Sequence, residues 1–144
     1  MSHKLNAPIY TISNAAKILD ISVHTLRMYE REGLIIPFRK SSNQRLYSEM
    51  DLERVRCIQK TINEDKINIE GMRRILALLP CWSIINCSET DRKNCDYYSN
   101  HTKPCWMVNH SSDICKDKEC RVCEVYQSFG TCESIKNKLK ELLP

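Results

Sequence analysis

The residues with the clearest chemistry are cysteines, and they gather in the second half of the chain. Of nine cysteines, all but Cys57 lie between residues 81 and 132. Thiolates at short spacings are soft ligands for zinc and for iron–sulfur clusters, and thiols also form regulatory disulfides. Residues 81–132 are therefore predicted to form a cysteine-rich module whose candidate metal or cluster ligands are Cys81, Cys87, Cys95, Cys105, Cys115, Cys120, Cys123 and Cys132.

Three chemistries remain open for this module. Cys115, Cys120 and Cys123 have the C-x4-C-x2-C spacing of plant-type [2Fe–2S] sites, although the fourth ligand there normally lies further along the chain. Zinc sites usually have two closely spaced pairs, whereas Cys120 and Cys123 form one C-x2-C pair. We favour an iron–sulfur cluster, with thiol–disulfide sensing and zinc as alternatives. Cys57, beside an apolar helix position, is expected to be an ordinary semi-buried thiol.

Charge and composition also differ between the two halves. The first 80 residues hold 13 Lys or Arg against 9 Asp or Glu, whereas the remaining residues hold 9 of each. The positive excess predicts an anionic partner for the first half. With 144 residues, 3 glycines and 5 prolines, the chain is too short for a large catalytic α/β fold, and helices should dominate. A cytoplasmic location without a membrane span is expected, because no long apolar run or signal-peptide core is present.

Local signals predict two short helices, a basic loop and two further helices over residues 1–80. The first helix covers residues 13–19 with Ser13 at its start, and the second runs from a Ser22 cap through about Arg31 and is stopped by Gly33. Residues 34–36 and 45–47 are predicted strands on either side of a polar, basic stretch. Ser48 with Asp51 starts the third helix, and Asn68 starts a fourth that ends at Pro80. Residues 133–144 are predicted to form an amphipathic helix on Ile135, Leu139 and Leu142.

Three segments carry a family resemblance. Tyr10-Thr11-Ile12, residues 21–34 and Arg45-Leu46-Tyr47-Ser48 resemble, in order and spacing, the MerR family of winged-helix transcription regulators. Residues 68–76 look like the heat-shock repressor branch of that family. Many members have a glycine in the wing where this chain has Ser42-Asn43-Gln44. The cysteines from 81 to 123, with a tryptophan after Cys81 and Cys105, resemble a small module called two-CW.

The expected DNA contacts come from the second helix and the wing. Short polar residues near the start of a recognition helix can approach base edges, and cations and hydroxyls can hold phosphates. The resemblance implies contacts by Arg27, Tyr29, Arg45 and Tyr47. The complete set of candidates is His24, Thr25, Arg27, Tyr29, Arg31, Arg39, Arg45 and Tyr47. Two alternatives stay open: the tyrosines are partly buried aromatics, and Arg31 pairs with a neighbouring glutamate.

The expected fold is mainly α: a winged helix-turn-helix domain over residues 1–80, then a loop-rich cysteine module over 81–132, then a helix over 133–144. The expected function is a sequence-specific DNA-binding transcription regulator that senses redox state or iron and is not an enzyme. Its expected partners are double-stranded DNA in an inverted repeat, a second copy of the chain, and RNA polymerase at a promoter. The alternatives are a thiol–disulfide oxidoreductase and a zinc-stabilised DNA-binding adaptor.

Overall fold

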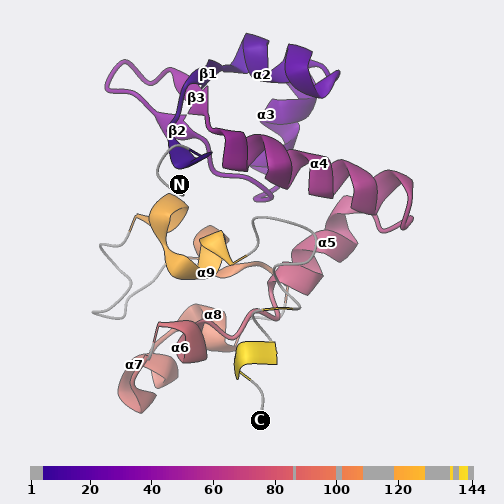
Figure 1. Cartoon of the computed structure of the whole chain (residues 1–144). Coiled ribbons are helices and arrows are strands. Elements are labelled where there is room, and N and C mark those ends of the chain that lie inside the picture. Colours follow the sequence, from indigo (N-terminus) through magenta and orange to yellow (C-terminus); the bar gives the residue numbers. More distant parts are fainter. Residues whose placement is uncertain are drawn as a thin grey trace. The chain divides into compact units, whose positions relative to one another are not determined.

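The computed structural model describes residues 5–85, 87–99, 102–108, 119–128, 137 and 140–142. The chain divides into two compact units, the first holding the residues up to Ile67 and the second beginning at Asn68 (Figure 1). The sequence places the boundary later, at residue 80. No helix in the described ranges is long and apolar enough to cross a membrane.

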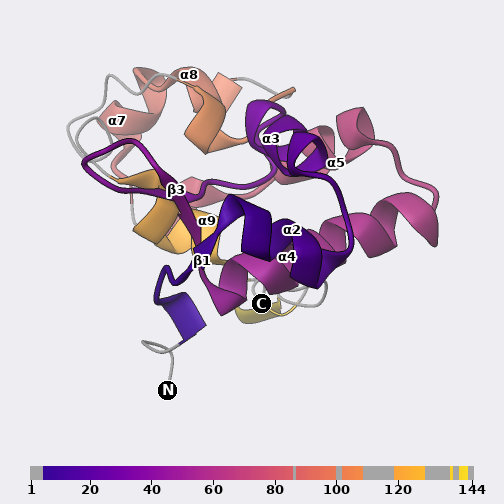
Figure 2. The same cartoon turned by 90° about the horizontal axis from the view of Figure 1, so that it is seen from above.

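The described part of the first unit combines helices with a small antiparallel sheet. In chain order the elements are β1 (Tyr10–Thr11), α2 (Ile12–Leu19), α3 (Val23–Arg31), β2 (Phe38–Arg39), β3 (Arg45–Tyr47) and α4 (Glu49–Asn63). The strand order is β1-β3-β2, with Tyr10 opposite Tyr47 and Phe38 opposite Leu46. The loop between β2 and β3 projects away from the helices as a wing (Figure 2).

Side-chain caps explain where these helices begin. The Ser22 hydroxyl accepts from the Thr25 backbone N–H at 3.0 Å, and Ser48 forms a capping box with Asp51, so both predicted starts are confirmed. Gly33, at φ 79°, follows the end of α3 as expected. The start at Ser13 is wrong, because Thr11 caps α2 by accepting from the Asn14 backbone N–H at 3.2 Å.

The predicted strand at residues 34–36 is also wrong. Leu34 and Ile35 are fully buried but do not pair with another strand, and the first wing strand is β2 at Phe38–Arg39. A short apolar run therefore marks the core here rather than the sheet. β1 was not among the predicted strands, because its two residues become a strand only by pairing with β3.

The core of the first unit lies between the inward faces of α2, α3 and α4. These helices place their apolar residues at helical spacing, so each presents one stripe to the others. The buried aliphatic side chains on these faces are Ala15, Ala16, Leu19, Leu26, Leu52, Val55 and Ile58. This packing leaves the opposite face of α3 open to solvent.

The second unit consists of short helices and turns: α5 (Ile69–Leu76), α6 (Cys81–Ile84), α7 (Glu89–Lys93), α8 (Asp96–Ser99), η1 (Cys105–Met107), η2 (Cys120–Val122) and α9 (Glu124–Gln127). Asn68 caps α5 as predicted, by accepting from the Gly71 N–H at 2.8 Å. The helix ends at Leu76, before Pro80. Of the predicted C-terminal helix, residues 137 and 140–142 are helical, whereas Ile135 and Leu139 lie outside the described residues.

Candidate nucleic-acid interface and thiol-rich unit

The solvent face of α3 presents three basic side chains. His24, Arg27 and Arg31 are exposed, and none has a hydrogen bond or ion pair within the described part of the chain. Their spacing puts them on one side of the helix, whereas Leu26 and Tyr29 are buried on the other. Arg31 does not pair with Glu30 or Glu32, so that alternative is wrong. The structure thus brings three predicted contact residues together on one open surface.

Thr25 has a structural role at the start of α3. Its hydroxyl lies 2.9 Å from the Ser22 hydroxyl, and its backbone N–H donates to the same Ser22 oxygen. The pair satisfies an amide that would otherwise lack a partner at the helix start. Thr25 therefore sits beside the basic face but is engaged in the cap.

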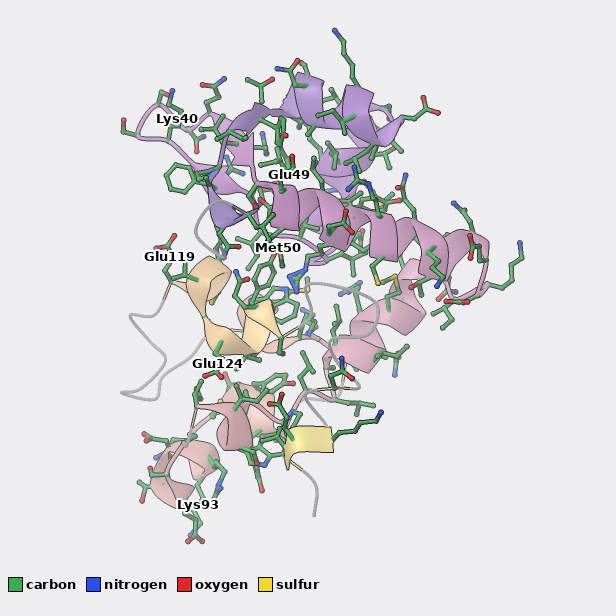
Figure 3. All side chains as sticks on the ribbon, in the orientation of Figure 1. Lys40, Glu49, Met50, Lys93, Glu119 and Glu124 are labelled. Carbon is green, nitrogen blue, oxygen red and sulfur yellow. The ribbon has the colours of Figure 1, made fainter. Side chains whose placement is uncertain are left out.

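The wing is built on an asparagine where a glycine is common in the resembled family. Asn43 adopts a left-handed conformation at φ 69°, and its N–H donates to the Lys40 carbonyl at 2.8 Å. Asparagine tolerates this conformation better than most residues with a side chain. Lys40 lies on the projecting loop, whereas Glu49 lies on the first turn of α4 (Figure 3). The loop is therefore ordered without glycine.

The two wing arginines share one carboxylate. The Arg39 Nη2 and Arg45 Nε atoms lie 2.6 and 2.5 Å from the two carboxylate oxygens of Glu30, which belongs to α3. Glu30 was not among the predicted functional residues, because its partners are distant in the sequence and the neighbouring Glu32 gives no local signal that separates the two acids.

Tyr29 and Tyr47 lie in the core rather than on the surface. Tyr29 is 6% exposed and Tyr47 is fully buried. The Tyr47 hydroxyl is buried and has no hydrogen-bond partner among the residues that the structure describes. The structure therefore places these two predicted contact residues as buried aromatics, the alternative that the sequence left open.

Burial of Tyr47 leads to a prediction at alkaline pH. Burial, and secondarily the Glu30 carboxylate, raises the pKa of Tyr47 from its ordinary value near 10 to about 12. The folded state binds the Tyr47 proton more tightly than the unfolded state does. The resulting contribution of Tyr47 to the free energy of unfolding is complete below pH 10 and is lost as pH rises toward 12. We expect a loss of about 2 kcal/mol across this window, which Tyr47→Phe abolishes.

Denaturant unfolding of both proteins at several pH values measures this difference. At neutral pH, Tyr47→Phe should be as stable as the wild type or more stable, since it removes a buried hydroxyl that has no partner. An equal pH dependence in the two proteins would contradict the assignment to Tyr47.

Six described cysteines of the second unit are in the reduced, thiol state: Cys81, Cys87, Cys95, Cys105, Cys120 and Cys123. Cys115 and Cys132, the remaining predicted ligands, lie outside the described residues. No group of three or more His, Cys, Asp or Glu side chains in the described ranges is arranged to hold a metal ion. The described thiols alone therefore do not form a preformed metal centre.

Tyr97 connects the thiol-rich segment to the end of α5. Its hydroxyl lies 2.6 Å from the Leu79 carbonyl oxygen, 2.9 Å from that of Ala77 and 3.5 Å from that of Leu76. Carbonyls at a helix C-terminus lack partners within the helix, so the hydroxyl donates where acceptors are in excess. Burial, followed by the thiols of Cys105, Cys81 and Cys95, raises the pKa of Tyr97 above its usual range.

Tyr97→Phe should lower the free energy of unfolding by about 1–3 kcal/mol, because it removes the buried hydroxyl that donates to the Ala77 carbonyl. The Leu76 and Leu79 carbonyls keep backbone donors, the N–H groups of Leu79 and Cys81. Tyr98→Phe is the matched control, since Tyr98 is 47% exposed and belongs to the same short helix. Chemical unfolding of the full chain measures both effects. Equal stabilities of the two variants would show that the Tyr97 hydroxyl contributes nothing.

The second unit contains an internal repeat that the sequence analysis missed. Pro80-Cys81-Trp82 is followed by Cys95-Asp96-Tyr97-Tyr98, and Pro104-Cys105-Trp106 is followed by Cys123-Glu124-Val125-Tyr126. In each copy the tryptophan makes an edge-to-face contact with the last tyrosine. The ring centroids are 5.0 Å apart for Trp82 and Tyr98, and 5.2 Å apart for Trp106 and Tyr126.

The two copies also match in burial at two positions, although Tyr98 is 47% exposed and Tyr126 only 3%. Cys81 and Cys105 are buried to a similar degree, and the residue before each final tyrosine, Tyr97 or Val125, is almost completely buried. The repeated Pro-Cys-Trp triplet and the recurring Cys-acid-x-Tyr were the sequence signal for this pairing. Cys81 corresponds to Cys105, and Cys95 corresponds to Cys123.

Cys57 differs from its expected state. This residue of α4 is 6% exposed and is disulfide-bonded, so the expectation of an ordinary thiol is wrong. Its position beside Ile58 in an apolar stripe suggested only packing, since a disulfide depends on a residue that is not a local neighbour.

The first unit defines a winged helix-turn-helix: two short helices at a tight turn, an open basic face on the second helix, and a β-hairpin wing. Residues 10–79 match the family described as MerR HTH family regulatory protein, and this part of the chain is a MerR-type helix-turn-helix domain.

Named relatives match the same region. The chain is 38% identical over 73 residues to heat shock protein HspR of Streptomyces coelicolor, an alignment that covers 51% of this chain and 48% of that protein. It is 36% identical over 69 residues to the HTH-type transcriptional regulator YyaN of Bacillus subtilis, covering 47% and 49% of the two chains. The regulator GlnR of Bacillus anthracis is 26% identical over 73 residues, covering 51% and 56%. The matched region spans about half the length of these relatives.

Proposed function

We propose that this chain is a DNA-binding transcription regulator that places α3 in the major groove and its wing on the flanking backbone. The observation that carries the proposal is the open face of His24, Arg27 and Arg31, whose side chains have no partners in the described structure. His24 is near the start of α3, where side chains reach base edges, Arg27 lies one turn further along the same face, and Arg31 is placed for a phosphate. The regulator names of YyaN and GlnR support the same function rather than an enzymatic one.

Selection of duplexes from a random-sequence pool, followed by fluorescence anisotropy at several salt concentrations, tests this proposal. We expect a recurring sequence to be recovered and its affinity to fall steeply with salt. Arg45→Ala should reduce the salt slope by about 1 if this arginine neutralises one phosphate. Recovery of no preferred sequence, or affinity that does not change with salt, would contradict DNA recognition by this surface.

The regulator acts as a homodimer on an inverted repeat in this proposal, and RNA polymerase at the promoter is its further partner. Ile75 and Leu78, on and just after α5, are 44% and 69% exposed, which supports a partner surface in the second unit. Sedimentation of the full chain should give a dimer, and Leu78→Glu should weaken it. Lys93→Glu, on an exposed position of the same unit, is the control. A monomeric wild-type chain would contradict the dimer.

In this proposal the second unit is the sensor. Its cysteines respond to iron or redox state, either through an iron–sulfur cluster or through thiol oxidation. Six reduced cysteines in one small unit support this, and three of them lie near Tyr97. The disulfide at Cys57 supports the thiol route, because it lies on a helix of the DNA-binding unit. A bound cluster would supply a group whose loss changes the charge and order of this unit.

Anaerobic purification, an absorbance spectrum and iron, sulfide and zinc analysis distinguish the routes. Bound iron and sulfide, lost on oxidation together with a several-fold change in DNA affinity, would support a cluster sensor. The repeat provides matched variants, since Cys81→Ser and Cys105→Ser should have equal effects on iron content. If reductant alone changes affinity and Cys57→Ser abolishes this change, the thiol route is supported. Zinc alone, with affinity unchanged by oxidation, would contradict sensing.

A further inference from the structure

Glu30 occupies a central place between the recognition helix and the wing. It lies on the last turn of α3, and its two carboxylate oxygens accept from Arg45 on β3 and Arg39 on β2. Arg39 also donates from Nη1 to the Asn43 side-chain oxygen at 3.0 Å. One carboxylate therefore connects the recognition helix to both wing strands and, through Arg39, to the turn between them.

The two arginines use their donors differently. Arg39 engages both terminal nitrogens within the protein, Nη2 with Glu30 and Nη1 with Asn43. Arg45 engages only Nε, so its terminal nitrogens have no partner in the described residues. The terminal edge of a guanidinium can bind a phosphate through two parallel hydrogen bonds. Arg45 is thus held through one edge while the edge suited to phosphate stays open.

The surroundings make this arrangement more rigid than an ordinary surface pair. The side chains of Glu30 and Arg45 are only 20% and 26% exposed. Tyr47, two residues after Arg45 on the same strand, is completely buried and fixes the strand in the core. Because the partly buried Glu30 carboxylate accepts from both arginines, it limits the rotamers that each can adopt, whereas arginines on a wing would otherwise move freely.

We propose that Glu30 is a positioning residue for DNA binding, which locks the wing to the recognition helix through Arg39 and orients the open edge of Arg45 toward a backbone phosphate. The proposal rests on the DNA-binding function proposed above. It assigns Arg39, one of the predicted contact residues, to holding the wing rather than to binding DNA.

Simple electrostatics predicts the opposite effect of removing this acid. A carboxylate near DNA repels phosphates, so its neutralisation should strengthen binding at every salt concentration. If Glu30 instead orients Arg45, its neutralisation weakens binding even though the protein becomes more positive. The sign of the change therefore separates the two effects.

The test measures affinity of the full chain for a labelled duplex recovered from the random-sequence pool. We expect Glu30→Gln to weaken binding several-fold. Glu53→Gln is the control, since it makes the same charge change and breaks an exposed ion pair with Arg56 in the same unit. Thermal unfolding checks that each variant is folded. Affinity of Glu30→Gln equal to or higher than that of the wild type would overturn the proposal.

A double-mutant comparison identifies the route of the effect. Adding Glu30→Gln to Arg45→Ala should cause no further loss in salt slope, because the carboxylate acts on phosphate contact through this arginine. Arg39→Ala should leave the salt slope unchanged, whereas Arg45→Ala lowers it by about 1. Equal slopes for the two arginine variants would overturn the division of roles. If the wild-type chain itself does not bind the duplex in a salt-dependent way, the proposed function fails and not only this inference.

Discussion

Replacing Arg27 with alanine is expected to lower affinity for the preferred duplex by about 1–3 kcal/mol, a factor of about 5 to 150. Arg27 lies on the open face of α3, and no group in the described structure competes for its guanidinium. An arginine that reads a base loses a bidentate contact on truncation, so discrimination against one altered base pair should fall with affinity.

Lys60→Ala is the matched control for this prediction, because it removes one exposed positive charge from α4 in the same unit. Anisotropy titrations with the preferred duplex and with single-base variants measure both affinity and discrimination. If Arg27→Ala weakens binding to all duplexes equally, this residue contacts the backbone. Equal affinity of the Arg27 variant and the wild type would show that the helix face does not bind DNA.

Leu26→Ala should destabilise the first unit by about 2–5 kcal/mol, the range for removing a buried leucine from a packed core. Leu26 is completely buried on the face of α3 opposite to Arg27. Its truncation removes apolar contacts and leaves a cavity under the recognition helix. The DNA affinity of the fraction that remains folded should change less than in Arg27→Ala.

Denaturant unfolding followed by circular dichroism measures the loss of stability. Lys17→Ala, on the exposed side of α2, should change stability little and serves as the control. A Leu26 variant as stable as this control would show that the core of the unit is not where the structure places it.

Local signals in the sequence were sufficient for most of the first unit. The starts at Ser22, Ser48 and Asn68 depend on hydrogen bonds within one turn, and such contacts can be predicted from neighbouring residues. The strands could not be predicted in the same way. β1 and β2 are two residues long and exist through pairing with β3, which is a contact between distant segments.

In the candidate site too, features set by local spacing could be predicted from the sequence, whereas those set by distant contacts could not. The exposed cations of α3 could be predicted because helical spacing alone puts them on one face. Burial of Tyr47 and the use of Glu30 by two arginines depend on how the wing folds back on α3. Cys57 shows the same limit, because its oxidation state depends on a distant residue. The tryptophan–tyrosine contacts were accessible from the repeated triplet, which a search for internal repeats would have found.

The hydroxyl of Tyr97 has a consequence for how this protein can be divided or recombined. Similarity to the regulator family ends at residue 79, but the Tyr97 hydroxyl, which hydrogen-bonds with the carbonyls of Leu76, Ala77 and Leu79, lies beyond that point. A fragment cut at residue 79 would keep every residue of the matched region and lose this side-chain donor at the end of its last helix. In chimaeric proteins made from this chain and a relative, α5 should therefore be transferred together with the segment that follows it. The limit of sequence similarity to the family and the limit of the folded unit thus lie at different residues in this chain.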